Sequence, residues 1–170
     1  MLYLLDANVL ITAHNSYYPI NRVPEFWEWL LHQAELGAVR IPIEILEEVR
    51  DGTGDPEKDL LYGWLQREDV RRALLLAEIV SPAAVQAVID TGYAPDLNDV
   101  EIERMGRDPF LVAYALTAPA DRCVVTNETS SPSRQRANRK LPDVCRMMGA
   151  NSCNTFALVK ALDFTTGWRH

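Results

Sequence analysis

A short apolar run that ends in an acid constrains the fold more than any other feature of this sequence. Residues 2–5 are apolar, and Asp6 follows directly. A run without a polar face predicts a strand that is buried on both sides, as in a parallel sheet covered by helices. Asp6 would lie at the carboxyl end of this strand, where an unpaired charge beside a buried edge lowers stability. The first six residues therefore predict both a sheet and a candidate functional residue.

Helical patterns alternate with short apolar runs along the rest of the chain. Pro24 opens a helix that Gly37 ends, and Pro42 opens a second helix through about Arg50 that Gly52 ends. Further helices are predicted after a turn at 54–56, from Ser81 to about Gly92, from Asp108 to Leu116, from Pro142 to Gly149 and from about Thr155 to Leu162, with loops at 93–98 and 129–140 and strands at 38–41, 124–126 and 150–153. This alternation predicts an α/β fold: a single-domain, three-layer α/β/α sandwich with a central, mostly parallel sheet.

Length and composition limit the class of protein. The chain has 170 residues, of which 48% are hydrophobic and 24% charged, so we expect residues 1–170 to form one globular domain. No apolar stretch approaches the roughly 20 residues that cross a bilayer, and residues 1–5 lack the basic leader of a secretory signal. The three cysteines, Cys123, Cys145 and Cys153, show no CxxC spacing, which favours free thiols. We therefore expect a cytoplasmic protein without a membrane segment.

Acids follow the predicted strands at the points where ligands bind in open parallel sheets, beyond the carboxyl ends. Asp6 follows the first strand, Glu128 follows the strand at 124–126, and Asp108 begins the helix that leads into that strand. Each acid alone has a structural explanation: Asp108, for example, could cap its helix, a contribution of about 1 kcal/mol. Their joint placement predicts that they meet in one pocket.

The helix after the second strand supplies further acids, namely Glu44, Glu47, Glu48 and Asp51. Glu44 and Glu48 share one helix face because they are four residues apart. At least one of the four could point into the same pocket, while ordinary solvent exposure explains the others.

Four segments together resemble the PIN-domain ribonucleases. They are YLLDANVLI at 3–11, IPIEILEEV at 41–49, RDPFLVAYAL at 107–116 and VVTNE at 124–128. In addition, KLPDVCRMMGA at 140–150 is similar to the ending of a VapC-like toxin branch of that family. The resemblance covers nearly the whole chain. It implies a PIN-like fold and a metal-dependent endoribonuclease, the toxin of a toxin–antitoxin pair.

The resemblance also implies roles for single residues. Asp6 corresponds to the acid after the first strand, and Asp108 to the acid that opens the helix of the DPFLVAYA motif. Glu128 stands where the family usually has Asp, so its longer side chain would contact the metal directly or through water. Asn8 and Thr126 correspond to polar positions that support these acids.

Among the helix acids, Glu48 best fits the glutamate of the family motif, and Glu47 and Glu44 remain alternatives. The catalytic and metal-binding set implied by the resemblance is therefore Asp6, Glu48, Asp108 and Glu128.

Such a cluster of acids requires a counter-charge. At about 5 Å mean spacing and an effective dielectric constant near 20, each pair of carboxylates repels by about 3 kcal/mol, and six pairs by roughly 20 kcal/mol. A domain's net stability is about 5 to 15 kcal/mol, so protons or cations must neutralise the site. The histidines form no HExxH motif. Ligation by oxygen alone selects hard ions, and we expect Mg²⁺ or Mn²⁺ to activate a water for phosphodiester hydrolysis.

The basic residues are concentrated late in an acidic chain. The formal net charge is −7, but residues 122–146 carry six Lys and Arg residues against two acids. From this strip we predict that Arg134, Arg136, Arg139 and Lys140 contact RNA phosphates; a solvated loop is the alternative.

Three further readings stay open. The main alternative is a catalytically silent PIN-like module that binds nucleic acid or protein. A phosphatase of the haloacid dehalogenase kind is disfavoured, because its motif needs a second acid at the position where Asn8 stands. Apolar helix faces with Phe26, Leu30, Tyr62 and Leu65 could support a homodimer or bind an antitoxin, although burial within the monomer also explains them.

Overall fold

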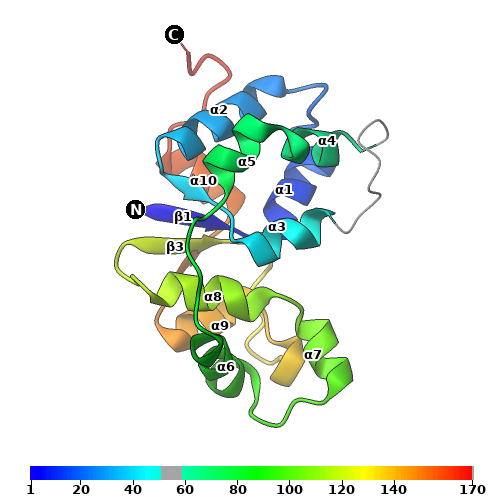
Figure 1. Ribbon diagram of the computed structural model, residues 1–170, viewed down its shortest axis with the longest axis vertical. Helices are drawn as coiled ribbons and strands as arrows, with labels where there is room; N and C mark the ends of the chain where they lie inside the picture. The colour runs from blue at the N-terminus through cyan, green and yellow to red at the C-terminus, as the bar shows by residue number, and fades with distance from the viewer. Residues whose placement is uncertain (51–58, 170) are drawn as a thin grey trace.

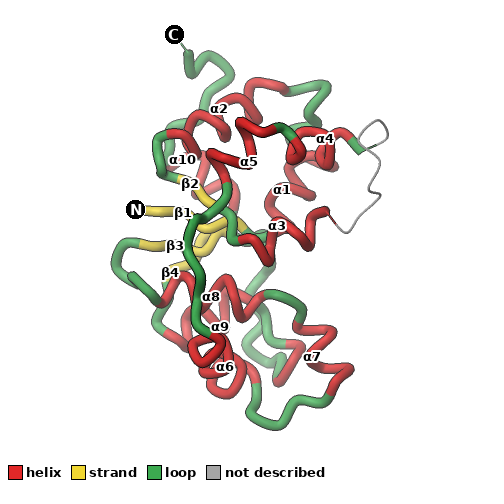
Figure 2. Tube along the Cα trace, in the orientation of Figure 1, coloured by secondary structure: helices red, strands yellow, loops and turns green. Residues whose placement is uncertain are grey.

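A four-stranded sheet forms the centre of the computed structural model, which describes residues 1–50 and 59–169. Its strands are β1 (Leu2–Leu5), β2 (Val39–Arg40), β3 (Arg122–Val125) and β4 (Asn151–Cys153). They are ordered β2-β1-β3-β4, and all three pairings are parallel. Figure 2 shows the strands between two groups of helices. The predicted parallel sheet is confirmed.

Helices cover both faces of this sheet. In Figure 1, α2, α5 and α10 lie above it and α6, α8 and α9 below it. The helices are α1 (Ala7–Thr12), α2 (Pro24–Glu35), α3 (Ile43–Arg50), α4 (Leu60–Gln66), α5 (Glu68–Leu74), α6 (Pro82–Val88), α7 (Asp99–Met105), α8 (Asp108–Leu116), α9 (Leu141–Met148) and α10 (Thr155–Ala161). The arrangement is the three-layer α/β/α sandwich that the alternating pattern predicts.

The apolar side chains of the two central strands form the middle of the core. Leu4, Leu5, Val124 and Val125 are all 0% exposed. The predicted helix ends are also present, since Gly37 and Gly149 adopt the left-handed backbone (φ +79° for each) that a glycine accepts most easily. Helix α8 is buried over most of its surface, which explains why its sequence is apolar all round.

Several short elements were not predicted from the sequence. They are α1, α5, α7, the π-helical turns Ala13–Tyr17 and Ile89–Tyr93, and a 3₁₀ turn at Arg136–Asn138 inside the predicted loop. Helix α7 begins with a capping box in which Asn98 and Glu101 exchange hydrogen bonds. The predicted stop at Gly52 and the turn at 54–56 lie outside the described residues.

The structure decides between the alternatives for two sets of side chains. Asp108 is the first residue of α8 and Arg107 is its N-cap, so the carboxylate of Asp108 does not cap the helix. Phe26, Leu30 and Leu65 are each 1% exposed and pack in the core, as the alternative of burial within the monomer predicts, while Tyr62 is partly exposed. In the described ranges, no helix is long and apolar enough to cross a membrane. Cys123, Cys145 and Cys153 are free thiols, as predicted.

The connections diverge between the two central strands. From β1 the chain continues to β2 on one side, and from β3 to β4 on the other. In open α/β sheets such a switch point leaves a crevice beyond the carboxyl ends of the two strands. Asp6 directly follows β1, and Thr126 directly follows β3.

Candidate active site

A pocket of about 330 Å³ lies beyond these strand ends, and all four acids predicted for the site line it. We call it the acidic pocket. Asp6 enters from the end of β1, Glu48 from α3, Asp108 from the first turn of α8 and Glu128 from the segment after β3. The fold thus brings four distant segments of the chain to one place, as the strand-end argument predicts.

Neutral hydrogen-bond donors hold the side chain of Asp6 at the carboxyl end of β1. It is only 5% exposed, and its Oδ2 accepts hydrogen bonds from Thr126 Oγ1 (2.7 Å) and from the Asn8 side-chain amide. Asn8 in turn accepts a hydrogen bond from the backbone N–H of Asn127 at 2.9 Å. Asn8 and Thr126 therefore make the supporting contacts that were expected of them.

Burial and the neighbouring acids raise the pKa values of Asp6 and Asp108. Burial raises the pKa of Asp6 to about 6, and the negative charges of Glu48 and Glu128 act in the same direction. Burial also raises the pKa of Asp108 well above its ordinary value, with further contributions from the charges of Asp6, Glu128 and Glu48. The pocket therefore concentrates negative charge that a cation would relieve.

Glu128 differs from the other acids because it is already paired. Its Oε1 lies 2.8 Å from Lys140 Nζ, and its Oε2 accepts a hydrogen bond from the backbone N–H of Leu141 at 2.8 Å. Since Leu141 is the first residue of α9, Glu128 also satisfies a free donor at the start of that helix. One of the four predicted metal ligands thus has a structural function of its own.

The structure separates Glu48 from its two alternatives. Glu44 accepts a hydrogen bond from Tyr114 OH at 3.4 Å, and Glu47 forms an ion pair with Arg107 at 3.2 Å. Among these three glutamates, Glu48 is the one that lines the acidic pocket. Asp51, the fourth helix acid, lies outside the described residues.

A second, basic pocket of about 270 Å³ adjoins the acidic pocket. Three of the four predicted RNA-binding residues line it, namely Arg134, Arg139 and Lys140. Arg139 donates a hydrogen bond to the backbone carbonyl of Gly92 at 2.9 Å, and Lys140 pairs with Glu128. The structure thus brings most of the predicted basic strip to the border of the acidic pocket.

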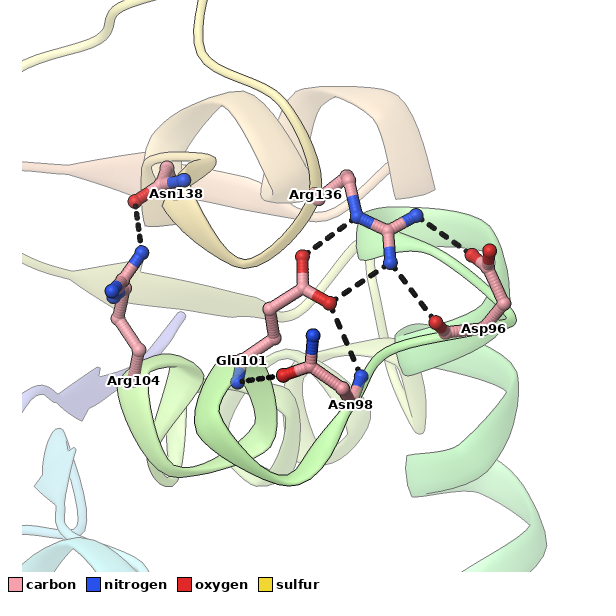
Figure 3. A network of polar contacts seen from close by, with 6 residues as sticks. All are labelled: Asp96, Asn98, Glu101, Arg104, Arg136 and Asn138. Atoms are coloured by element: carbon pink, nitrogen blue, oxygen red, sulfur yellow. Dashed lines mark hydrogen bonds and ion pairs between the residues drawn. The ribbon is translucent and has the colours of Figure 1, made fainter.

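Arg136, the fourth predicted RNA-binding residue, is placed differently. Figure 3 shows its guanidinium between Glu101 and Asp96, with ion-pair distances of 2.6 Å and 2.7 Å. The hydrogen bonds from Arg136 hold the pKa of Glu101 down to about 2. This network joins the 3₁₀ turn to α7, so Arg136 stabilises the wall of the site, and its contact with RNA stays a prediction.

Several residues near the site were missed in the sequence, among them Glu103, Arg104 and Arg107, which line the acidic pocket. Arg104, near the end of α7, lines both pockets, and its guanidinium donates a hydrogen bond to Asn138 Oδ1 at 3.3 Å (Figure 3). It carries no motif, because α7 itself was not recognised. The capping box at Asn98 and Glu101 is the signal that would have revealed α7.

Tyr93 is a further missed residue. It is 6% exposed, and its hydroxyl has no hydrogen-bond partner among the described residues, although burial and the neighbouring Asp108 carboxylate raise its pKa. Tyr93 is the last residue of the π-helical turn Ile89–Tyr93. This turn packs closely on α9, since a Cβ on the preceding Gly92 would lie 2.7 Å from Val144 Cγ1. A buried hydroxyl without a partner next to an acidic pocket is a donor that a bound ligand or water can use.

The donor set suits a hard divalent cation, since the pocket offers carboxylate oxygens and no thiol or imidazole. Asp6, Glu48 and Asp108 are the residues that could hold it. Within the part of the chain that the structure describes, however, no three His, Cys, Asp or Glu side chains are grouped tightly enough to hold one ion. The acids share a pocket without being gathered around a single point.

Fold and site together define a three-layer α/β protein with an acidic pocket at the switch point of a parallel sheet. The chain belongs to the family described as a domain of unknown function (DUF4411), which it matches over residues 3–166. The matched region includes both pockets. No curated protein and no solved structure matches the chain.

Proposed function

We propose that this protein is a Mg²⁺- or Mn²⁺-dependent endoribonuclease that hydrolyses RNA phosphodiester bonds with a metal-activated water. One observation carries the proposal: carboxylates from four separate segments line one pocket at the switch point of the sheet. Two of them, Asp6 and Asp108, have pKa values raised by burial and by their acidic neighbours. The motif resemblance to the PIN-domain ribonucleases agrees with this choice of chemistry.

The proposed roles follow from the contacts of each residue. Asp6, Glu48 and Asp108 would hold the cation, and Thr126 and Asn8 fix the orientation of the Asp6 carboxylate through their hydrogen bonds. Glu128 keeps Lys140 and the start of α9 at the border of the pocket. A bound divalent ion would lower the pKa of a water and offset charge on the phosphate oxygens.

The similarity of residues 140–150 to the VapC-like ending leads us to add that the protein acts as a toxin in the cytoplasm. Its partners would be RNA and a cognate antitoxin, and a second copy of the chain is a further candidate. The alternative function is a catalytically silent nucleic-acid or protein-binding module. The ion pair between Glu128 and Lys140 favours that alternative, because it already neutralises one of the four acids without a metal.

The decisive experiment compares Asp6→Asn with the unmodified protein on total cellular RNA in Mn²⁺. Asn keeps the shape and the acceptor oxygen but removes the charge, so we expect folding to persist and cleavage to fall by on the order of 100-fold or more. Glu68→Gln is the matched control, because it removes one charge from an exposed position on α5, outside both pockets. Undiminished cleavage by Asp6→Asn, with normal thermal unfolding, would refute the proposed function.

A further inference from the structure

The acidic and basic pockets are two parts of one continuous surface. Both are lined by Arg104, Met105, Asp108 and Glu128, so these four residues form their common wall. One side of the wall carries Asp6 and Glu48, and the other carries Arg134, Arg139 and Lys140. Opposite charges therefore meet across a single boundary.

Three guanidinium groups in this surface, those of Arg104, Arg134 and Arg139, lack a carboxylate partner among the described residues, but Arg139 donates to the backbone carbonyl of Gly92 at 2.9 Å. Arg134 is exposed, and the hydrogen bond that the structure gives it is from its backbone N–H to Ser131 O at 2.9 Å. Arg104 is also exposed and binds the neutral side chain of Asn138. By contrast, Arg67, Arg122 and Arg136 all pair with carboxylates at 2.6 to 2.8 Å. In a chain of net charge −7, two unpaired arginines beside one pocket are free to bind an anion.

Ion pairs and hydrogen bonds fix the segments around Arg104. Arg136 joins the 3₁₀ turn to α7 through Glu101 and Asp96, and the same turn presents Asn138 to Arg104 (Figure 3). Arg139 fixes the other edge by binding the carbonyl of Gly92. An arginine that is oriented before binding loses less conformational entropy when it engages a phosphate.

We propose that the basic pocket binds a phosphate next to the one cleaved at the acidic pocket, with Arg104 and Arg134 as its ligands. The inference rests on the proposed function and narrows its substrate to polynucleotide chains with at least two consecutive phosphates. Guanidinium groups bind phosphate oxygens in a bidentate way, and Arg104, on the common wall, is placed to contact the strand where it passes from one pocket to the other.

Substrate length tests this arrangement. A dinucleoside monophosphate has one phosphate and cannot occupy both pockets, whereas a trinucleotide with two phosphates can. We expect Arg104→Ala and Arg134→Ala to lower kcat/KM about tenfold for the trinucleotide, mostly through KM, and to have a several-fold smaller effect on the dinucleotide. Arg72→Ala is the matched control, because it removes the same charge from an exposed position on α5.

Binding supplies a readout that does not depend on cleavage. With fluorescein-labelled single-stranded RNA in EDTA, each substitution should reduce the slope of log Kd against log salt by about 0.7, while Arg72→Ala leaves it unchanged. Arg104→Lys should restore most of the salt slope but not the full affinity. If Arg104→Ala and Arg134→Ala bind and cleave RNA like Arg72→Ala, the inference is overturned, and cleavage by all variants leaves the proposed function standing. If no variant cleaves but the two arginines still control binding, the nuclease proposal fails and the phosphate site is supported.

Discussion

Asp6 and Glu128 carry the same charge in the same pocket but have opposite surroundings. Asp6 is buried, receives hydrogen bonds from neutral groups and faces the charges of Glu48 and Glu128. Glu128 is paired with Lys140 and with the N–H of Leu141. The difference indicates that the half of the pocket around Asp6 and Asp108 would gain from a bound cation, whereas Lys140 already neutralises Glu128 in the other half. The predictions below start from this division, from the largest expected effect to the smallest.

The largest expected effect concerns the half of the pocket around Asp6 and Asp108. Asp108→Asn and Asp6→Asn should each lower cleavage on the order of 100-fold or more, and Glu128→Gln only about tenfold. Without metal at pH 7.5, Asp6→Asn should also raise the free energy of unfolding by about 3 kcal/mol, because it removes a buried charge whose pKa is raised from 3.8 to about 6. Chemical denaturation in EDTA measures this. Equal losses of activity in all three variants would remove the distinction.

Metal binding should stabilise the same half. At a Mg²⁺ concentration of about 100 times Kd, the free energy of unfolding should increase by about 2.7 kcal/mol, which raises Tm by roughly 5 to 11 °C. Asp6→Asn should lose most of the gain, and Glu128→Gln should keep most of it. Thermal unfolding with MgCl₂ or EDTA gives the comparison, and an unchanged Tm in the unmodified protein would contradict a metal site.

The stability of the metal-free protein and its stabilisation by Mg²⁺ should change with pH in opposite directions. The pKa of Asp6 is raised from 3.8 to about 6 in the folded state, so its contribution favours the folded state below pH 3.8 and is lost as the pH rises through about 6. The metal-free protein should therefore gain stability from pH 7.5 to pH 5, while the Mg²⁺-induced gain shrinks because protons compete for the same oxygens.

A smaller effect is expected at the paired half. Lys140 and Glu128 are partly exposed, with side chains 40% and 25% accessible, so their ion pair should contribute about 0.5 to 1 kcal/mol. A double-mutant cycle with Lys140→Met and Glu128→Gln measures this coupling. A coupling energy near zero would mean that Lys140 does not hold Glu128.

The smallest effect concerns Tyr93, whose buried hydroxyl has no partner among the described residues. Tyr93→Phe should leave the free energy of unfolding unchanged or raise it by up to about 1 kcal/mol. Tyr114→Phe is the control, because Tyr114 OH donates to the carbonyl of Glu78 at 3.2 Å and its removal should lower stability by about 1 kcal/mol. Equal losses in the two variants would show that Tyr93 has a partner in solution.

Prediction from sequence succeeded where a pattern was long or placed at a strand end. Apolar runs predicted β1, β2 and β3, a fourth strand was correctly placed at 150–153, and the proline and glycine boundaries predicted α2 and α9 to within one residue at each end. It failed for α1, α5 and α7, which have six or seven residues and show no clear period, whereas α6, of the same length, was predicted because Ser81 and Pro82 mark its start. Arg104 was missed together with α7. Arg136 was grouped with its basic neighbours because composition does not show which carboxylate a side chain will meet.

The sequence by itself determined the layered α/β fold and the placement of Asp6, Asp108 and Glu128 at one edge, because local periodicity and the chemistry of strand ends are encoded in neighbouring residues. Only the tertiary structure decided that Glu48 lines the pocket, that Lys140 neutralises Glu128 and that Arg104 borders both pockets. These outcomes depend on contacts between segments that are distant in the chain, where the angle and depth of packed helices set which charges meet.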